Sequence, residues 1–206
     1  VKEGGQIFLA AVSEPQWAVF CDVLGLADLK ADRRYATNND RVRLRPELLA
    51  TLRERIRLPI LVDADTGFGG VHNIRKMVRA FERAGVAALF LSDQVFPNRC
   101  GYMPGKQIVS AAEMMTRVYA ALDSRTDPNL VIAARTDARA LEGINAAIER
   151  CQMFQEAGCD MVLPPGCDSY ADAKQTREAL EKHTSYNMSH AAGKAKLTLK
   201  QGEDLG

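Results

Sequence analysis

Apolar and polar positions divide the chain into two parts with different periodicities. Before residue 57, apolar side chains recur at helical spacing, most clearly in the stripe Trp17, Phe20, Cys21 and Leu24. After it, short apolar runs alternate with helical stretches, a pattern typical of repeated β/α units around a parallel sheet. We therefore expect a small, mostly helical segment over residues 1–56 and an α/β unit over residues 57–206.

The helical segment carries start signals for its helices. Ser13 is suited to cap the first helix, and Thr37 or Asn38 to cap a further one. Pro46 fits a first helical turn, and a short strand is expected at Gln6–Val12. None of these residues suggests chemistry, so we interpret the segment as packing structure.

Apolar runs in the second part predict strands at Leu58–Asp63, Ala87–Leu91, Leu130–Ala134, Met161–Leu163 and about Ser185–Met188. Helices are expected between them. The stretches FERAGVAALFLSD and FQEAGCDMVLPPG repeat one helix end, an Ala-Gly turn and a strand. The right-handed crossover rule makes such a sheet parallel. Because these strands are too few to close an eight-stranded barrel, we expect an open or incomplete one.

Two carboxylates stand at the end of the first strand, within the stretch LPILVDADTGFGG. Asp63 and Asp65 are two positions apart, so on a strand both side chains share one face. The carboxyl ends of strands are where α/β folds bind ligands. Two acids together are costly to desolvate unless a cation lies between them. Mg²⁺ fits, because it takes oxygen ligands and usually one or two carboxylates.

The glycine-rich turn Gly67–Gly70 admits other interpretations. A glycine turn before a helix suggests dinucleotide binding, but the third glycine of G-x-G-x-x-G falls on His72. The preceding acids would also sit badly against a pyrophosphate. A plain turn beside two solvated acids stays open as the alternative to a metal or substrate site.

A long loop, Asp93–Lys106, is the second stretch that contains candidate functional residues. Loops of more than about 12 residues in compact domains often carry lids or binding segments. Cys100 has Arg99 and Gly101 as neighbours. A positive neighbour favours the reactive thiolate, and glycine permits close approach of a ligand. An inert thiol is the alternative.

The third signal is Arg135, at the end of the apolar run VIAA. An arginine at a strand's carboxyl end is well placed to bind a carboxylate through two hydrogen bonds. A structural ion pair with one of the strand-end acids explains its position equally well.

Composition excludes several classes of partner. The chain has 206 residues, 47% hydrophobic and 26% charged, with a formal net charge of +1. Basic residues are scattered, which argues against nucleic acid or an anionic membrane surface. No apolar run reaches the roughly 20 residues of a membrane span, and no signal peptide is visible. Five cysteines without a C-x-x-C pair favour neither a disulfide framework nor a zinc site, so we expect a cytoplasmic protein.

Several motifs together resemble one known family. They are VDADTGFGG (62–70), DQVFPNRCGYMPGK (93–106), IAARTDARALEG (132–143), EAGCDMVLPP (156–165) and NMSHAAGKAKLTLKQGEDLG (187–206). On these motifs, residues 58–206 are similar to the isocitrate lyase/phosphoenolpyruvate mutase superfamily, in its methylisocitrate lyase-like form. The resemblance implies a (β/α)₈ TIM barrel that assembles as a homo-oligomer, with its site at the carboxyl ends of the strands.

The resemblance also implies roles for individual residues. Asp63 and Asp65 match the family's carboxylates for Mg²⁺, with Mn²⁺ as the alternative ion. The metal binds a small 2-oxo or 2-hydroxy carboxylate and stabilises an enolate-like state. Cys100 matches the cysteine that protonates the departing carbanion, and Arg135 an arginine that holds a substrate carboxylate. The remaining substrate-binding positions that match are Arg99, Gly101 and Asn187.

Four family positions carry different residues here. The metal-linked Glu before Asp-Gln is Ser92, and the Glu after the strand-end Pro is Pro165. The Lys and His of the cysteine motif are Asn98 and Tyr102. Losing charge-positioning groups at a preorganised site lowers the rate by orders of magnitude, so we expect impaired turnover.

Residues 1–56 show a second resemblance, to the family III CoA-transferases in the part that follows their catalytic region. It is carried by GGQIFLAAVSEPQWAVFCDVLGLADLKADRRYATNNDRV. The catalytic Asp of that family lies upstream of this region and has no counterpart here. Transferase activity is therefore not implied.

We predict a Mg²⁺-dependent carbon–carbon lyase that acts on a small carboxylate with impaired turnover. One alternative is a non-catalytic, degenerate barrel that serves as a binding or assembly piece. The other is a remnant related to CoA-transferases.

Overall fold

The sheet consists of five parallel strands in the computed structural model, which describes residues 13–56, 59–101, 103–164, 169–181, 183–184 and 197–205. The strands are β1 (Leu61–Asp63), β2 (Ala88–Ser92), β3 (Val131–Arg135), β4 (Met161–Leu163) and β5 (His183–Thr184). They lie side by side in chain order, β1-β2-β3-β4-β5, and every neighbouring pair is parallel.

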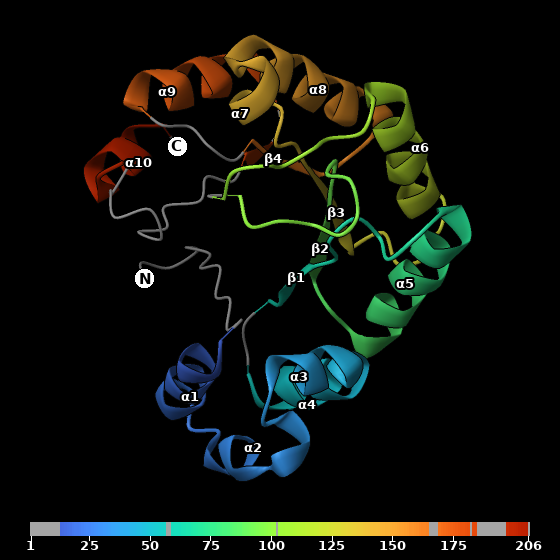
Figure 1. Ribbon diagram of the computed structural model, residues 1–206, viewed down its shortest axis with the longest axis vertical. Coiled ribbons are helices and arrows are strands. Elements are labelled where there is room, and N and C mark those ends of the chain that lie inside the picture. Colours follow the sequence, from blue (N-terminus) through green and yellow to red (C-terminus); the bar gives the residue numbers. More distant parts are fainter. Residues whose placement is uncertain are drawn as a thin grey trace.

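Helices connect consecutive strands on one side of this sheet. They are α5 (Val71–Ala84), α6 (Ala111–Leu122), α8 (Ile144–Ala157) and α9 (Tyr170–Ala179). Right-handed crossovers between strands in sequential order put every helix on the same face, and Figure 1 shows them as an arc outside the strands. This is the winding of a (β/α) barrel rather than of a doubly wound sheet. The predicted fold class, an α/β barrel-like parallel sheet that the described strands do not close, is confirmed.

The main hydrophobic core lies between the sheet and these helices. Its strand residues include Leu89, Leu91 and Ile132, each at most 1% exposed. Helix α5 contributes Ile74 and Val78, both completely buried. Burial of a large aliphatic side chain stabilises the fold by roughly 1.5–3 kcal/mol, so this layer holds the strands in register.

The internal repeat predicted from sequence is confirmed. Gly85 and Gly158 end α5 and α8 with φ of 73° and 109°, the left-handed region that favours glycine. Each lies a few residues before a strand, β2 or β4. The same kind of helix end therefore leads into β2 and into β4.

Short helices precede the sheet and form a second hydrophobic cluster. They are α1 (Glu14–Val23), α2 (Ala27–Ala31), the 3₁₀ helix η1 (Arg33–Tyr35), α3 (Asn38–Arg43) and α4 (Arg45–Arg55). Trp17, Tyr35 and Leu52 belong to this cluster, whereas Leu49 on α4 belongs to the main core. The predicted division at residues 56 and 57 stays a prediction.

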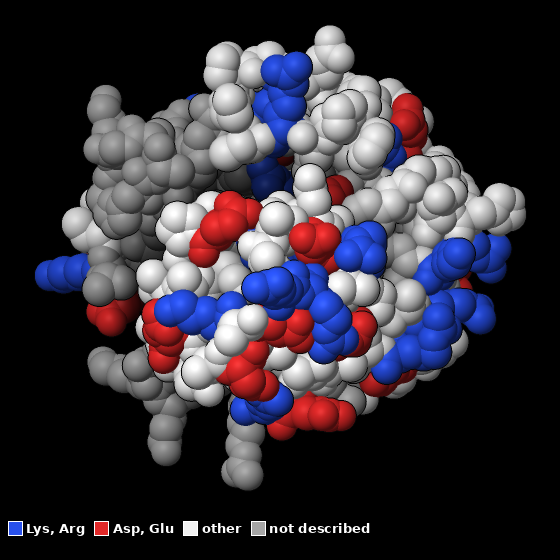
Figure 2. Space-filling view, turned by 60° about the horizontal axis from the view of Figure 1, so that its bottom comes forward, with Lys and Arg blue, Asp and Glu red and all other residues white. Residues whose placement is uncertain are grey.

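The surface near these helices carries both signs of charge. In Figure 2, basic and acidic side chains alternate across the face that the helical segment presents. Ion pairs such as Lys30–Asp22 at 2.7 Å and Arg55–Asp28 at 2.6 Å join exposed side chains there. Such mixed charge does not favour a polyanion as the partner of this face.

The predicted helix starts agree with the structure, since Thr37 caps α3 and Pro46 lies in the first turn of α4. Strand β5 lies before the predicted Ser185–Met188. That stretch and the strand expected at Gln6–Val12 lie outside the described residues.

Two further short helices, α7 (Arg139–Glu142) and α10 (Leu199–Leu205), were not predicted.

Among the described residues, no helix has the length and apolar character that crossing a membrane requires.

Candidate functional site

The carboxyl ends of β1, β2 and β3 meet at one edge of the sheet. Ser92 is the register partner of Arg135 across β2 and β3. The Ser92 amide donates to the Asp65 carbonyl at 2.7 Å, and the Asp93 amide donates to the Arg135 carbonyl at 3.1 Å. The structure therefore brings the predicted metal carboxylates and the predicted carboxylate-binding arginine to the same edge.

The two strand-end acids do not share a strand face, so that expectation is wrong. Strand β1 ends at Asp63, and Asp65 has a φ of 49° in the turn that follows. The turn folds Asp65 back, so that its amide donates to Asp63 Oδ1 at 2.9 Å. The two residues are joined by this tight turn and not by strand alternation.

Asp63 lies in a partly desolvated environment. Burial raises the pKa of its carboxyl group, and the Asp65 carboxylate raises it further. The Asp65 amide and the charges of Arg135 and Arg45 oppose this, but the net direction is upward. Arg45 also holds the strand end directly, since its Nη1 donates to the Asp63 carbonyl oxygen at 3.0 Å.

Asp63 and Asp65 are suited to a hard cation that takes most of its ligands from water and substrate. Within the described residues, no group of three or more His, Cys, Asp or Glu side chains could enclose a metal ion. Mg²⁺ commonly uses one or two protein carboxylates and completes its shell with water and substrate. Asp63 and Asp65 supply that number, and a cation would stabilise the charged form of Asp63, whose pKa is raised by burial and to a lesser extent by the Asp65 carboxylate.

Arg135 forms an ion pair, but not with the acids of β1. Its Nε and Nη2 donate to the two carboxylate oxygens of Asp137 at 3.1 and 3.3 Å. The structural ion pair considered from sequence is therefore present, with a partner two residues further along the chain. Arg135 remains close enough to Asp63 for its charge to lower the pKa of that carboxyl group.

Asp137 gathers several donors in a buried position. Its side chain is 1% exposed and also accepts from Gln94 Nε2 at 2.8 Å and from Lys106 Nζ at 3.2 Å. Burial would raise the pKa of Asp137, but the charge of Arg135, the bond from Gln94 and the charge of Lys106 outweigh it and lower the pKa. Asp137 is therefore a buried, ionised hub of this edge.

Gln94 and Lys106, which donate to Asp137, also hold the long loop against the strand ends. Gln94 makes two bonds with Arg99, accepting from its amide at 2.9 Å and donating to its carbonyl at 3.0 Å. Lys106 Nζ donates to the Gly101 carbonyl at 2.5 Å. At the base of the loop, the Val95 amide donates to the Gln107 carbonyl at 2.9 Å.

Gly101 lies against Arg135. A Cβ built on Gly101 would come within 2.7 Å of Arg135 Nη2, so a side chain at this position would displace the guanidinium. Arg99 and Cys100, the preceding residues, are exposed. The loop thus brings Gly101 to the strand-end edge while the Arg99 and Cys100 side chains face solvent.

A second buried network stands behind this edge. Asp93 is completely buried and accepts from Thr136 Oγ1 at 2.6 Å, from the Asp137 amide at 2.9 Å and from Arg150 Nη1 at 3.3 Å. Burial raises the Asp93 pKa in spite of these donors. Arg150 also donates to the Val109 carbonyl at 3.0 Å, which connects α8 to the base of the loop.

Sequence reasoning missed Asp93, Gln94, Asp137 and the contacts of Lys106. Their position in the sequence could have identified them, since Asp93 and Gln94 come just after the apolar run that becomes β2, and Asp137 comes just after β3. Asn187, predicted to bind substrate, lies outside the described residues, as do Tyr102 and Pro165.

A model of the phosphoenolpyruvate phosphomutase family matches residues 31–206. This range contains the strand-end residues and both buried networks, and it begins within the N-terminal helical segment.

Curated relatives of the chain are lyases. The 2-methylisocitrate lyase of Vibrio cholerae is 50% identical over 127 residues, which are 62% of this chain and 41% of that protein. The 2,3-dimethylmalate lyase of Eubacterium barkeri is 40% identical over 153 residues, which are 74% of this chain and 53% of that protein. The chain thus spans about half, or less, of the length of these relatives.

Solved structures agree with the fold. Oxaloacetate acetylhydrolase in complex with 3,3-difluorooxalacetate has a TM-score of 0.72 at 29% identity, over 78% of this chain and 55% of that one. A 2,3-dimethylmalate lyase, described as a PEP mutase/isocitrate lyase superfamily member, has a TM-score of 0.71 at 29% identity, over 81% and 55%. The predicted superfamily is confirmed, whereas these matches do not support the CoA-transferase-like character of residues 1–56.

Proposed function

Because the chain belongs to the phosphoenolpyruvate phosphomutase family, we propose that it carries the metal- and carboxylate-binding strand ends of a Mg²⁺-dependent carbon–carbon lyase. The substrate class is a small 2-oxo or 2-hydroxy carboxylate. Relatives named for 2-methylisocitrate and 2,3-dimethylmalate support this class, since both compounds are small hydroxy acids with several carboxylates.

Asp63 and Asp65 are the proposed ligands for Mg²⁺, with Mn²⁺ as the alternative. When bound, the ion supplies Lewis-acid chemistry that draws electron density from the oxygens at the carboxylate end of the substrate. The turn that bonds the Asp65 amide to Asp63 Oδ1 at 2.9 Å preorganises these ligands.

Arg135 is proposed to hold a substrate carboxylate. Its guanidinium is already oriented by Asp137, so little side-chain freedom is lost when a second anion binds. Arg99, Gly101 and Asn187 are proposed as further substrate-binding positions, and Cys100 as the group that donates a proton to the carbanion left by cleavage. Because the Cys100 side chain is exposed here, this last role requires the loop to bring the thiol to the strand ends when substrate binds.

The observation that carries the proposal is the contact between Gly101 and Arg135. The Cβ position of Gly101 lies 2.7 Å from Arg135 Nη2, which brings the backbone next to Cys100 to the carboxylate-binding group. The backbone beside the proposed proton donor then lies at the same edge as the proposed anion receptor and metal carboxylates, and this supports carbon–carbon cleavage beside a carboxylate.

Ser92 supports a slow enzyme. It is completely buried, carries no charge, and its Oγ accepts from the Gln94 amide at 3.2 Å. A hydroxyl engaged in this way replaces an acidic partner of the metal centre, so we propose weaker metal binding and reduced turnover.

Ligand-linked stabilisation tests the binding half of the proposal. The melting temperature should rise with Mg²⁺ and oxalate together, because a ligand that binds only the folded state stabilises it by an amount that grows with the logarithm of its concentration above the dissociation constant. Asp63→Asn should abolish this rise, whereas Asp28→Asn, in an exposed pair with Arg55, should keep it. The ligands should be present at about 100 times a dissociation constant in the millimolar range. If the melting temperature of the wild-type chain does not rise at that concentration, the proposal is contradicted.

A second candidate is ligand binding without catalysis, which Ser92 also favours. Pyruvate release from 2-methylisocitrate, followed with a coupled dehydrogenase, separates the two. Cleavage that Cys100→Ser abolishes supports the lyase, and Mg²⁺-dependent oxalate binding without any cleavage supports the binding protein.

A further inference from the structure

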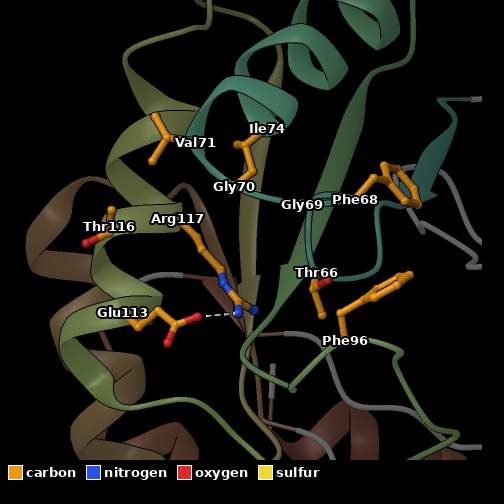
Figure 3. Close-up of a pocket in the computed structure, with 10 residues that line it drawn as sticks. All are labelled: Thr66, Phe68, Gly69, Gly70, Val71, Ile74, Phe96, Glu113, Thr116 and Arg117. Atoms are coloured by element: carbon orange, nitrogen blue, oxygen red, sulfur yellow. Dashed lines mark hydrogen bonds and ion pairs between the residues drawn. The ribbon is translucent and has the colours of Figure 1, made fainter.

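A pocket of about 420 Å³ lies outside the strand-end site, between the turn that follows β1 and helix α6. Figure 3 shows Thr66 and Phe68 on the right of the view, and Glu113 and Thr116 of α6 on the left with Arg117 toward the centre. Phe96, from the long loop, lines it as well. None of the residues proposed for the lyase site lines this pocket.

The N-terminus of α5 supplies positive potential to the pocket. Gly70 is the N-cap, and it has no side chain with which to accept the first amide groups of this 14-residue helix. The first turn also contains no acidic residue that would complement the helix dipole. The amides of Asn73 and Ile74 donate to the Gly70 carbonyl, whereas those of Val71 and His72 have no acceptor among the described residues.

A hydroxyl group without a partner in the described part of the protein is an independent sign of a ligand. Thr66 is 2% exposed and lines the pocket. Within the described part of the chain, its hydroxyl has no hydrogen-bond partner. The Thr66 hydroxyl is not among the fully buried side-chain atoms that lack a partner, so it opens onto the pocket and is available to pair with a ligand oxygen.

The charged side chains of the pocket limit the ligand to one negative charge. Arg117 Nη2 pairs with Glu113 at 2.7 Å, and its Nη1 donates to the carbonyls of Ser92 and Gln94 at 3.3 and 2.9 Å. The charges of Arg117 and Glu113 therefore offset each other, and the helix N-terminus provides the remaining positive potential. A partial charge of about +0.5 suits a monoanion better than a dianion.

The rest of the wall is apolar. Phe68 and Val71 are 37% and 39% exposed, and Phe96 is 64% exposed, so ligand binding would remove apolar surface from water. We propose that this pocket binds a small monocarboxylate with a short branched apolar chain. The carboxylate accepts from Thr66 and the first amides of α5, and the chain packs against Phe68 and Phe96.

Isovalerate is a suitable probe, and isovaleramide at the same ionic strength is its neutral control. Ligand-observed saturation-transfer NMR should detect isovalerate, and the ¹⁵N-HSQC signals of Val71 and His72 should shift with it. Isovaleramide should bind at least tenfold more weakly, because a charged acceptor gains more from a helix N-terminus. Equal binding of the acid and the amide would overturn the proposal.

Variants at Gly70 test the helix N-terminus directly. A Cβ at Gly70 meets nothing within 4 Å and its φ is −76°, so a side chain is accommodated. Gly70→Asp should cap α5 with its own carboxylate, raise the melting temperature and abolish isovalerate binding. Gly70→Ala, which adds a Cβ without a carboxylate, should bind isovalerate more tightly than Gly70→Asp. Undiminished binding in a folded Gly70→Asp variant would overturn the proposal.

Two further comparisons test the hydroxyl and the apolar wall. Thr66→Val should weaken isovalerate binding by about tenfold, since one hydrogen bond to a charged group is lost. Phe96→Ala should weaken it about threefold to tenfold, whereas Met103→Ala, an equally exposed apolar change on the same loop, should have no effect. An equal effect of Phe96→Ala and Met103→Ala would contradict the assigned pocket.

Discussion

Arg135 and Gly101 are in direct contact, with only 2.7 Å between Arg135 Nη2 and the position where a Cβ on Gly101 would lie. The two residues come from β3 and from the loop after β2. Their contact places the loop that carries Cys100 against the proposed carboxylate receptor.

Gly101→Ala should therefore separate the loop from Arg135. We expect a loss of about 1–3 kcal/mol in the free energy of unfolding and at least tenfold weaker oxalate binding in the presence of Mg²⁺. Urea unfolding and calorimetry measure the two effects. Gly70→Ala is the matched control, since a Cβ there meets nothing within 4 Å, and it should cost no more than about 1 kcal/mol. Unchanged stability and affinity of Gly101→Ala would refute the contact.

Asp137→Asn should destabilise the protein in a pH-dependent way. The folded-state pKa of Asp137 lies below the ordinary value of 3.8, because the charges and bonds of its donors outweigh burial. Its stabilisation is thus fully present above the unfolded-state pKa and is lost as the pH falls through the folded-state value.

The measurable quantity is the difference in unfolding free energy between wild type and Asp137→Asn. It should be largest above about pH 5, on the order of 3 kcal/mol, and should shrink as the pH falls below 3.8. Distant carboxyl groups titrate alike in both proteins and cancel in the difference, whereas Asp93, whose pKa the Asp137 charge raises, does not. A difference that grows toward low pH would contradict the ionised hub.

Arg150→Ala should be strongly destabilising, because it leaves the buried carboxyl group of Asp93 without its cationic partner. We expect a loss of about 3–5 kcal/mol in the free energy of unfolding. Arg55→Ala is the control, since both side chains of the Arg55–Asp28 pair are exposed by 43% and 59%. Its cost should lie within about 1 kcal/mol, as is usual for surface pairs. Similar costs for the two variants would show that the Asp93 network contributes little.

The helical segment should unfold together with the sheet. Leu49 on α4 is 8% exposed and belongs to the main core, so the two parts share buried surface. Trp17 is the single tryptophan and reports on the helical cluster, whereas far-UV circular dichroism reports on the whole chain. The two urea transitions should coincide, and Leu49→Ala should shift both by about 2–5 kcal/mol. Separate transitions would instead support independent units on either side of residue 56.

The sequence by itself determined the order of the elements and the kind of sheet. Apolar runs such as Ala87–Leu91 are typical of strands buried on both faces of a parallel sheet covered by helices, and β2 lies within one residue of that run. Gly85 and Gly158 end helices because glycine tolerates the left-handed conformation, which a local pattern is able to predict. The position of acids and arginine at strand ends likewise follows from the chain alone, as parallel strands end at one edge.

Only the tertiary structure decided which side chains meet at that edge. Gln94 and Asp137 are 43 residues apart, and Lys106 and Asp137 are 31 apart, so their bonds depend on strand register and on the path of the loop. Asp65 departs from strand alternation because its backbone bends into a turn with a φ of 49°. Buried charges must find partners wherever the fold places them, and those partners are set by packing across the molecule and not by neighbouring residues.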